Sequence, residues 1–256
     1  MAPKLPARIH EVLGRASRKG RRAEQQDRFL VLYASGALFL LVADGLGGHS
    51  GGARAAEIVK KTARKMFLKE PLAPAESLFP AFMRQAWEHL RAEEARRTGL
   101  ELRSTAVLIR LRGRGQAEWA HVGDSRLYLF NPEGELRQRT RDHSLATLAV
   151  FNGDMTEEEA RRHPDRSILY QCLGGEKPPK PLLGRAEPPL EDGSLVLVCT
   201  DGFWEHVEPG REWFGQGRLA DRVKATLAEA EKRAGQEADN ATLLAFEYRA
   251  DLFPES

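Results

Sequence analysis

Cysteine is the scarcest residue in this chain of 256 residues, which contains only Cys172 and Cys199. Two cysteines with apolar neighbours cannot build a disulfide framework, and they favour a reducing compartment. Neither is followed by an arginine six residues later, because Pro178 and Glu205 hold those positions. The Cys-x5-Arg loop of cysteine phosphatases is therefore absent, and we expect both cysteines to pack in the core.

Long apolar runs and a strong excess of one charge are also missing. No run approaches the roughly 18 apolar residues of a membrane span, and the N-terminal MAPKLPARIH lacks the apolar stretch of a signal peptide. The formal net charge is only +2, without the basic excess that is typical of nucleic-acid binders. We expect a cytoplasmic monomer that has no nucleic-acid or membrane partner.

The sequence does contain enough apolar material for one large core, since 41% of its residues are hydrophobic, and we predict a single domain over residues 1–256. Strand-like patterns cover residues 29–33, 37–43, 104–111, 116–123, 125–130, 194–200 and 241–248, and helical periodicity covers 53–70, 77–97 and 217–233. The three strands between 104 and 130 predict an antiparallel meander. Thr156 and Glu159 predict a capping box on a short helix, within a mobile insertion between about 140 and 190. This order favours an α+β fold with two mainly antiparallel sheets and helices on their outer faces.

Four carboxylates lie where apolar strands begin or end. They are Asp44 in LFLLVADG, Asp124 in WAHVGDSR, Asp201 in VLVCTDG and Asp239 in ADNATLLAF. A single Asp-Gly or Asp-Asn step is ordinary turn chemistry. Four such acids at converging strand ends would repel one another, and each buried charge would cost several kcal/mol. A bound cation removes that cost, and oxygen ligands without Cys or His suit Mg²⁺ or Mn²⁺, the ions of two-metal phosphoryl hydrolysis.

The glycine-rich run after Asp44, GLGGHSGG, does not fit a nucleotide-binding loop. No lysine lies between Asp44 and Arg54, as a P-loop requires, and Gly45 and Gly47 are followed by Ser50 where a dinucleotide loop has glycine. An aspartate directly before the loop would also repel a phosphate unless a metal intervened. A glycine beside the acid instead lets a backbone carbonyl approach an ion closely.

Eight motifs, in their order along the chain, resemble the PP2C (PPM) family of metal-dependent protein phosphatases in its compact bacterial branch. They are RRAEQQDRF (21–29), DGLGGH (44–49), RSTAVLI (103–109), HVGDSRLYLF (121–130), TRDHSLA (140–146), GDMTEEEARRHPDR (153–166), CTDGFWE (199–205) and DNATLLAF (239–246). The resemblance implies a PP2C-like four-layer α-β-β-α sandwich, in which helix pairs flank two sheets. It also implies hydrolysis of phosphoserine and phosphothreonine in proteins, two Mn²⁺ or Mg²⁺ ions, and a flap insertion at about 142–181 that influences substrate choice.

The resemblance also implies a metal site, residue by residue. Asp44 matches the acid that bridges two ions, and Gly45 matches the glycine that offers its carbonyl to the second ion. Asp201 and Asp239 match the remaining ligands of the first ion. Asp124, together with Asp201, matches the residues that hold a third, weaker ion in bacterial relatives.

A phosphate-binding arginine and the surroundings of the metal waters follow from the same resemblance. Arg22, five residues before Asp27, matches the arginine that grips the substrate phosphate, and a guanidinium suits this bidentate task. Arg18 and Arg21 are the alternatives at this position. Gln26, which precedes Asp27, stands where many members carry an acid; it can still hydrogen-bond metal waters, but metal affinity is expected to be weaker.

The general acid is not identified by the sequence. Leu46 stands where animal members carry the histidine assigned as proton donor. His49 is nearby, although a structural role at the start of a helix is the better interpretation, and a metal-bound water is an alternative donor. Asp142 and His143 match the entry of the flap, where we expect them to anchor the loop.

Trp204 and Glu205 resemble the subgroup associated with type VI secretion clusters, in which the phosphatase opposes a threonine kinase. The implied mechanism is attack in line on phosphorus by a water that bridges the two ions, while Arg22 and the ions neutralise the phosphoryl oxygens. No phosphoenzyme is expected. The alternatives are a catalytically silent module that binds phosphoproteins, which has no need of Asp44, Asp201 and Asp239, and a hydrolase of small phosphoesters.

Overall fold

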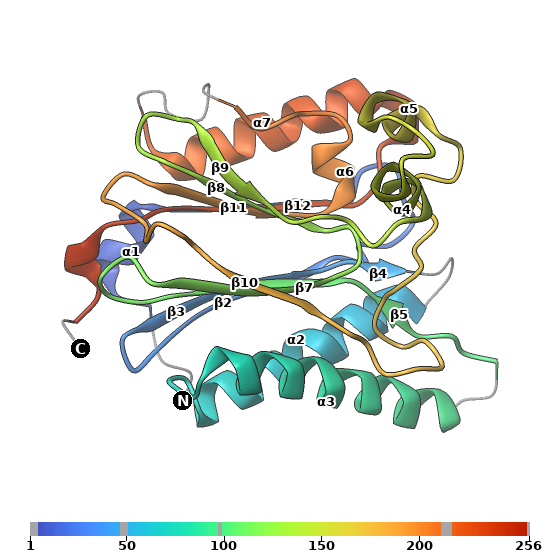
Figure 1. The fold of residues 1–256 in the computed structure, drawn as a ribbon, viewed down its shortest axis with the longest axis horizontal. Coiled ribbons are helices and arrows are strands. Elements are labelled where there is room, and N and C mark those ends of the chain that lie inside the picture. The colour runs from blue at the N-terminus through green and yellow to red at the C-terminus, as the bar shows by residue number, and fades with distance from the viewer. Residues whose placement is uncertain (1–4, 47–50, 97–98, 211–216, 255–256) are drawn as a thin grey trace.

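The computed structural model describes residues 5–46, 51–96, 99–210 and 217–254. Two five-stranded sheets lie face to face, with helices on both outer sides (Figure 1). The predicted α+β class with two antiparallel sheets is confirmed. None of the helices in the described ranges is both long enough and apolar enough to cross a bilayer.

The first sheet contains strands from both ends of the chain, in the order β1-β12-β11-β8-β9. Its strands are β1 (Leu13–Arg18), β8 (Arg126–Phe130), β9 (Leu136–Arg139), β11 (Leu195–Cys199) and β12 (Ala241–Glu247). The helix α7 (Leu219–Ala234) covers its outer face, and the short α6 (Asp201–Trp204) follows β11. Gly235 is the C-cap of α7. In the described ranges, the outer side of this sheet carries one long and one very short helix.

The second sheet has the order β10-β7-β6-β3-β2. Its strands are β2 (Arg28–Ala34), β3 (Ala37–Ala43), β6 (Ala106–Leu111), β7 (Ala117–Val122) and β10 (Leu182–Arg185). A pair of long helices, α2 (Gly51–Lys69) and α3 (Ala75–Ala95), packs on its outer face. A small ladder joins β4 (Gly45–Leu46) to β5 (Arg103–Ser104), and α1 (Ala7–Glu11) precedes β1.

The strands read as continuous apolar runs because they are buried on both faces. In β3, Leu38 and Leu40 join the core between the sheets, whereas Phe39 joins the core under α2 and α3. The Phe39 ring stacks on Phe67 of α2 with 4.5 Å between centroids. Successive side chains of β3 thus point to opposite faces of the sheet, but all of them are apolar. This pattern is typical of a sheet that is covered on both sides.

One prediction about topology is wrong. The three strands between 104 and 130 do not form a meander, because only β6 and β7 pair as a hairpin and β8 lies in the other sheet, between β11 and β9. The chain crosses between sheets at residues 123–125, where Gly123 has a φ of +107°. A side chain there would also collide with Thr105, so glycine is required for this crossing.

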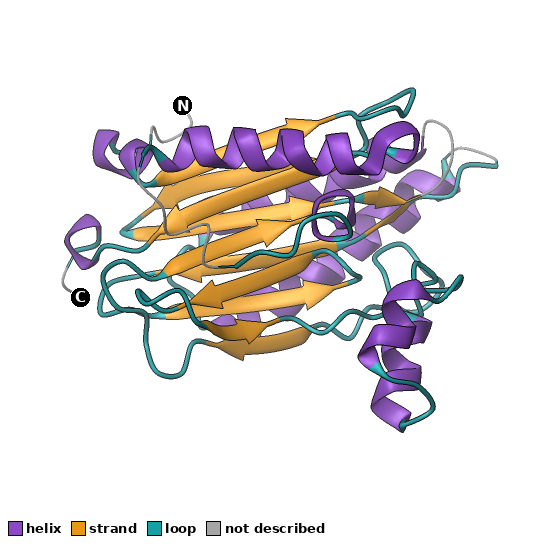
Figure 2. Cartoon of the chain, turned by 90° about the horizontal axis from the view of Figure 1, so that it is seen from above, coloured by secondary structure: helices purple, strands orange, loops and turns teal. Residues whose placement is uncertain are grey.

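The segment between β9 and β10 projects at one end of the sandwich (Figure 2). It contains α4 (Leu145–Asn152) and α5 (Glu157–Arg162), and the predicted capping box of Thr156 and Glu159 is present at α5. β9 and β10 are edge strands of different sheets, so this segment connects the outer edges of the two layers.

Candidate metal and phosphate site

Five carboxylates lie around one end of the sandwich, and we call this group the acid end. It comprises Asp27, Asp44, Asp124, Asp201 and Asp239. Asp44 follows β3, and Asp27 precedes the antiparallel β2, so both lie at the same end of one sheet. In the other sheet Asp201 follows β11 and Asp239 precedes the antiparallel β12. The antiparallel register thus explains why acids that are distant in sequence meet.

Mutual repulsion and burial act strongly on the acid end. Burial, followed by the charges of Asp201 and Asp27, raises the pKa of Asp44 well above its usual range. Burial, followed by the charges of Asp124 and Asp239, does the same to the pKa of Asp201. These carboxylates therefore resist ionisation together unless a positive charge joins them.

Two buried carboxylate oxygens at the acid end have no hydrogen-bond partner. Asp27 is 3% exposed and Asp124 is 5% exposed, and in each residue Oδ1 is unpartnered. The other oxygen of Asp27 accepts a hydrogen bond from the Thr200 hydroxyl at 3.0 Å. Burial raises the pKa of Asp27 to about 6 and that of Asp124 to about 7. Unpartnered buried oxygens of this kind fit the demands of a hard cation.

Gly45 lies beside these acids in close backbone contact with the start of α2. It pairs with Ser104 in the small ladder, and its carbonyl lies against Gly52 in the first turn of α2. A methyl group on either glycine would overlap the other's carbonyl. The preceding carbonyl, of Asp44, is already used by Thr105 N–H at 2.8 Å and the Ser104 hydroxyl at 2.9 Å.

Among the three candidate arginines, the structure places Arg22 at the acid end. Its guanidinium forms an ion pair with Asp239 at 2.6 Å, and its side chain is 63% exposed. The hydrogen bond to Asp239 is the main cause of its raised pKa, and the charges of Asp201 and Asp44 add to it. Arg18 instead pairs with Glu231 of α7 at 2.6 Å. The Arg21 N–H donates to Ala238, which fixes the loop but leaves its side chain exposed.

Asn240 attaches the loop of residues 19–27, which contains Arg22 and which we call the arginine loop, to β12. Its amide donates to the carbonyls of Lys19 and Glu24 and accepts from the backbone N–H of Gln26 at 2.7 Å. The Gln26 side chain lies close to Gly52, since a Cβ on that glycine would stand 2.8 Å from the Gln26 carboxamide. Gln26 is therefore placed between the arginine loop and the start of α2.

The acids converge without enclosing a ready-made coordination sphere. Asp239 uses one oxygen for Arg22 and the other for Asn240 N–H, and Asp201 accepts from Gly202 N–H at 2.7 Å. Within the described ranges, no three His, Cys, Asp or Glu side chains are already grouped as ligands of one ion. The donor set still fits Mg²⁺ or Mn²⁺, because all of its side-chain donors are carboxylate oxygens, and Oδ1 of Asp27 and of Asp124 has no hydrogen-bond partner.

Asp142 and His143 anchor the segment that leaves β9, as predicted. Asp142 forms a bidentate ion pair with Arg126 at 2.9 and 2.6 Å. His143 accepts the Gly123 N–H on Nδ1 at 3.0 Å, and its ring stacks on buried His121 with 4.7 Å between centroids. Burial lowers the pKa of His143 to about 4 and that of His121 to about 3, so both rings are neutral at pH 7.

Sequence reasoning missed a connection that runs through Trp204. Its indole N–H donates to the carbonyl of Asp124 at 3.0 Å, and the Arg126 guanidinium lies over its ring at 3.3 Å from the centroid. Trp204 thus joins Asp124, Arg126 and, through it, Asp142. The sequence does contain a signal for this connection. Arg126 begins the apolar strand β8, and a charged residue in such a place needs a partner.

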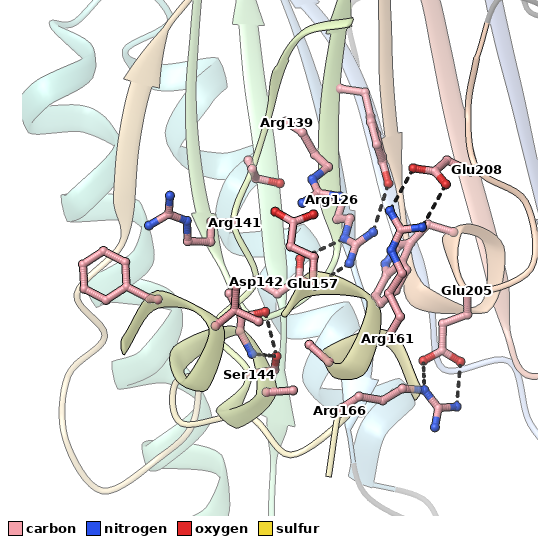
Figure 3. Close-up of a pocket in the computed structure, with 18 of the residues that line it drawn as sticks. Arg126, Arg139, Arg141, Asp142, Ser144, Glu157, Arg161, Arg166, Glu205 and Glu208 are labelled. Atoms are coloured by element: carbon pink, nitrogen blue, oxygen red, sulfur yellow. Dashed lines mark hydrogen bonds and ion pairs between the residues drawn. The ribbon is translucent and has the colours of Figure 1, made fainter. Parts of the chain in front are cut away.

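A cleft of about 710 Å³ is shown in Figure 3, and we call it the arginine cleft. It adjoins the acid end through Trp204, which lines the cleft and donates to the carbonyl of Asp124. Its walls come from β8 and β9, from α4 and α5, and from the end of α6 and the residues that follow it, up to Glu208. Its charged lining residues are Arg126, Arg139, Arg141, Asp142, Glu157, Arg161, Arg166, Glu205 and Glu208. The sequence did not predict this cleft.

Leu46, His49 and the two cysteines are the remaining residues singled out in the sequence. Leu46 is half-buried in β4, and His49 lies outside the described residues. Cys199 is buried in the core, as predicted, whereas Cys172 is only partly buried; both are free thiols.

Comparison with known proteins defines the class of this fold. Residues 15–244 match the family model of protein phosphatase 2C. The chain therefore belongs to the protein phosphatase 2C family.

Its relatives are bacterial. The chain is 33% identical over 204 residues to the serine/threonine protein phosphatase PstP of Mycobacterium tuberculosis, an alignment that covers 78% of this chain and 38% of PstP. The chain thus spans well under half the length of that relative. The structure of the Streptococcus agalactiae serine/threonine phosphatase is 26% identical with a TM-score of 0.80, covering 92% of this chain and 99% of that one. A structure of the PstP catalytic domain in complex with two manganese ions is 27% identical with a TM-score of 0.76, covering 92% and 98%.

Proposed function

We propose that this chain hydrolyses phosphoserine and phosphothreonine in proteins and that it depends on Mn²⁺ or Mg²⁺. The observation that carries the proposal is the acid end, where five carboxylates from four strand ends and one crossing loop lie at one end of the sandwich, and where burial and mutual repulsion raise the pKa values of Asp44 and Asp201. Repulsion within this group calls for divalent cations. The membership of the protein phosphatase 2C family and the manganese-bound PstP catalytic domain support the same chemistry.

The proposed ligands are Asp44, Gly45, Asp201 and Asp239 for two ions and Asp124 with Asp201 for a third. Two bound ions would supply a water of lowered pKa as nucleophile and positive charge for the phosphoryl oxygens. The chain's own residues hold these groups in place: Thr105 fixes the backbone of Asp44 through its hydroxyl at 3.0 Å. Trp204 fixes the backbone of Asp124.

Asp27 and Gln26 have the proposed task of orienting water beside the ligands. Thr200 holds one Asp27 oxygen, so the unpartnered Oδ1 stays available to accept a hydrogen bond. Gln26 is held by Asn240 through its backbone, which leaves its carboxamide directed toward Gly52. A glutamine contributes no negative charge, so cation binding is weaker than with an acid at this position.

Arg22 has the proposed task of binding the substrate phosphate. Its exposed guanidinium already donates to one carboxylate oxygen of Asp239, and a phosphate can accept two such hydrogen bonds and carries more charge. Attack by a cysteine is disfavoured by the structure, because burial raises the pKa of both Cys199 and Cys172 and so suppresses the thiolates.

The physiological substrate is proposed to be a protein phosphorylated by a bacterial serine/threonine kinase. The bacterial relatives named as serine/threonine phosphatases support this proposal. The assignment to a type VI secretion cluster stays a prediction from Trp204 and Glu205.

The test is release of phosphate from a phosphothreonine peptide by the purified full chain, with Mn²⁺ and with EDTA. Asp201→Asn should lower kcat/KM by at least about 10³-fold, since the amide loses the charge that holds a cation. Binding of Mn²⁺ by isothermal titration calorimetry should weaken in parallel. The matched control is Asp154→Asn, which removes an exposed carboxylate in the segment between β9 and β10 and should change neither readout.

Three other outcomes would count against the proposal. Phosphate release that is equal in Mn²⁺ and EDTA would contradict metal dependence. Mn²⁺ binding without any release from phosphopeptides would indicate a silent binding module. Hydrolysis of an aryl phosphate but of no phosphopeptide would indicate a hydrolase of small phosphoesters.

A further inference from the structure

The arginine cleft contains more positive charge than its carboxylates neutralise. Three of its five arginines are paired, and the pairs are Arg126 with Asp142, Arg161 with Glu208, and Arg166 with Glu205. The first pair is nearly buried, and the other two connect α5 and the residues after it to residues 205–208 across the mouth of the cleft (Figure 3).

Arg139 and Arg141 are the two arginines left over. Neither forms an ion pair with any carboxylate in the described ranges of the chain. Arg141 lies over the ring of Phe151 at 5.4 Å from the centroid, and Phe151 is 71% exposed. One lining carboxylate, Glu157 in the first turn of α5, also has no ion pair there. The cleft therefore presents two guanidinium groups and one competing carboxylate.

An apolar wall stands beside these two arginines. The helix α4 is apolar around most of its circumference, and its apolar residues that line the cleft are Ala146, Val150 and Phe151. Ala146 is buried, whereas Phe151 is 71% exposed. Tyr170 lies outside this lining and is 51% exposed; burial raises its pKa and the nearby charge of Arg141 opposes that rise. Exposed aromatic rings next to arginine are the composition of binding surfaces rather than of ordinary solvated ones.

The arginine cleft opens directly beside the acid end. Trp204 lines the cleft and bonds to the backbone of Asp124, and Arg126 lines it two residues after Asp124. Asp201 begins α6, and Glu205, which lines the cleft, lies four residues later. Four residues of helix rise about 6 Å, which is about two residues of an extended peptide. A peptide held at the acid end by its phosphate thus reaches the cleft within a few residues.

We propose that the arginine cleft binds acidic side chains of the substrate protein located about two to five residues from the phosphorylated residue. Arg139 and Arg141 receive the carboxylates, and the apolar wall of α4 packs against the intervening side chains. This inference rests on the proposed phosphatase function and adds a substrate class to it, namely phosphorylation sites in acidic surroundings. Charge complementarity selects this occupant, because the unpaired groups of the cleft are mainly cationic.

The experiment compares three phosphothreonine peptides of equal length, flanked on both sides by Glu, Gln or Lys at positions two to five. In Mn²⁺, kcat/KM for the Glu peptide should exceed that for the Gln peptide by about three- to tenfold, and the Lys peptide should be poorest. Arg139→Gln and Arg141→Gln should each lower the Glu-to-Gln ratio by about two- to fivefold. Glu157→Gln should raise the ratio, because it removes the competing carboxylate.

Arg137→Gln is the matched control. Arg137 lies on β9 as Arg139 does, but it pairs with Glu135 and lines a different cavity. The substitution removes the same unit of charge, so an unchanged ratio would show that the effect is local. A ratio lowered equally by Arg137→Gln would reduce the effect to overall charge and overturn the proposal.

Failure of this inference can be told apart from failure of the proposed function. Hydrolysis of all three peptides with equal kcat/KM would refute acidic selection and leave the phosphatase intact. If no peptide is hydrolysed, binding still decides: fluorescein-labelled, unphosphorylated Glu and Gln peptides are compared by anisotropy with the wild-type chain and with Arg139→Gln. Tighter binding of the Glu peptide that Arg139→Gln abolishes supports the cleft; equal binding overturns it.

Discussion

The acid end and the arginine cleft are neighbours, yet they hold their charges in opposite ways. At the acid end, buried and partly buried carboxylates lie together, and burial and their mutual repulsion raise the pKa values of Asp44 and Asp201. In the cleft, most arginines have a carboxylate partner within the chain, and the outer pairs are exposed. In the proposed function the first region binds divalent cations, whereas the charges of the second region are almost balanced and leave a small positive surplus for a partner. A buried charge without a partner costs much free energy, whereas an exposed charge costs little and contributes only weakly to binding.

The largest effect on stability is expected from removing one charge of the buried ion pair in the cleft, Arg126 with Asp142. Burial lowers the pKa of Arg126, but the hydrogen bonds and charge of Asp142 more than offset this, so its pKa is raised overall. Asp142→Asn leaves the guanidinium without its counter-charge and should lower the free energy of unfolding by about 3 to 5 kcal/mol. Urea unfolding monitored by tryptophan fluorescence measures the change. A loss below about 1 kcal/mol would mean that Trp204 and Tyr128 alone suffice for Arg126.

The pH dependence of stability tests the requirement at the acid end. The pKa of Asp27 is raised to about 6, so the folded chain holds a proton that the unfolded chain releases near pH 4. The stabilisation is present below pH 4 and is lost as pH rises through about 6. In EDTA, this residue alone should make the free energy of unfolding about 3 kcal/mol smaller at pH 8 than at pH 4.

Urea melts between pH 4 and 8 provide this measurement, and Asp27→Asn is the comparison. The amide cannot titrate, so its profile should be flatter over this range. Addition of Mn²⁺ should restore stability most at high pH, because the ligands must be ionised to bind it. A wild-type profile in EDTA that rises toward pH 8 would contradict the prediction.

Arg22 offers a smaller effect that links the acid end to the substrate. Arg22→Lys keeps the charge but replaces a planar fork by a point charge, so kcat/KM for a phosphopeptide should fall about 10- to 100-fold. Arg21→Lys, at the neighbouring position with an exposed side chain, is the control and should change kcat/KM less than twofold. Equal losses in both variants would show that Arg22 has no particular role among the arginines of this loop and would contradict the prediction.

The exposed pairs of the cleft should give the smallest effect. Glu208→Gln removes the partner of Arg161, whose side chain is 54% exposed, and should change the free energy of unfolding by less than about 1 kcal/mol. The same urea measurement applies as for Asp142→Asn, and the two variants are matched in chemistry but differ in burial. A loss as large as that of Asp142→Asn would remove the distinction between buried and exposed pairs on which the comparison depends.

The sequence was sufficient for most of the fold and for the members of the acid end. Asp44, Asp201 and Asp239 were identifiable because each adjoins a strand whose apolar run is unmistakable, and antiparallel pairing then brings such ends together. The crossing of β8 into the other sheet was not identifiable, because short apolar strands do not specify which sheet they join. It depends on the backbone at Gly123 and on the contacts of Asp124 beyond it.

The arginine cleft escaped prediction for a related reason. Pairs such as Arg126 with Asp142, or Arg161 with Glu208, join residues 16 and 47 positions apart, and no periodicity signals them. Trp204 in the sequence resembles the subgroup associated with type VI secretion clusters. Its hydrogen bond to the carbonyl of Asp124 depends on how α6 packs against residues 123–125 and is not visible in the sequence. Side-chain pairing across loops is decided by tertiary geometry, whereas strand ends are decided by local sequence.

The attachment of the segment between β9 and β10 has a consequence for protein engineering. Both of its anchoring strands lie at the outer edges of their sheets, so no interior strand pairing has to be interrupted to exchange it. The length and composition of this segment can therefore diverge around α4 and α5 while the two sheets and the strand ends stay as they are. Grafting residues 140–181 from one relative into another should transfer peptide preference and leave the host's core packing in place, provided that the graft keeps two buried residues. These are Leu173, which belongs to the core under α2 and α3 and pairs with Ser104, and Asp142, the partner of Arg126.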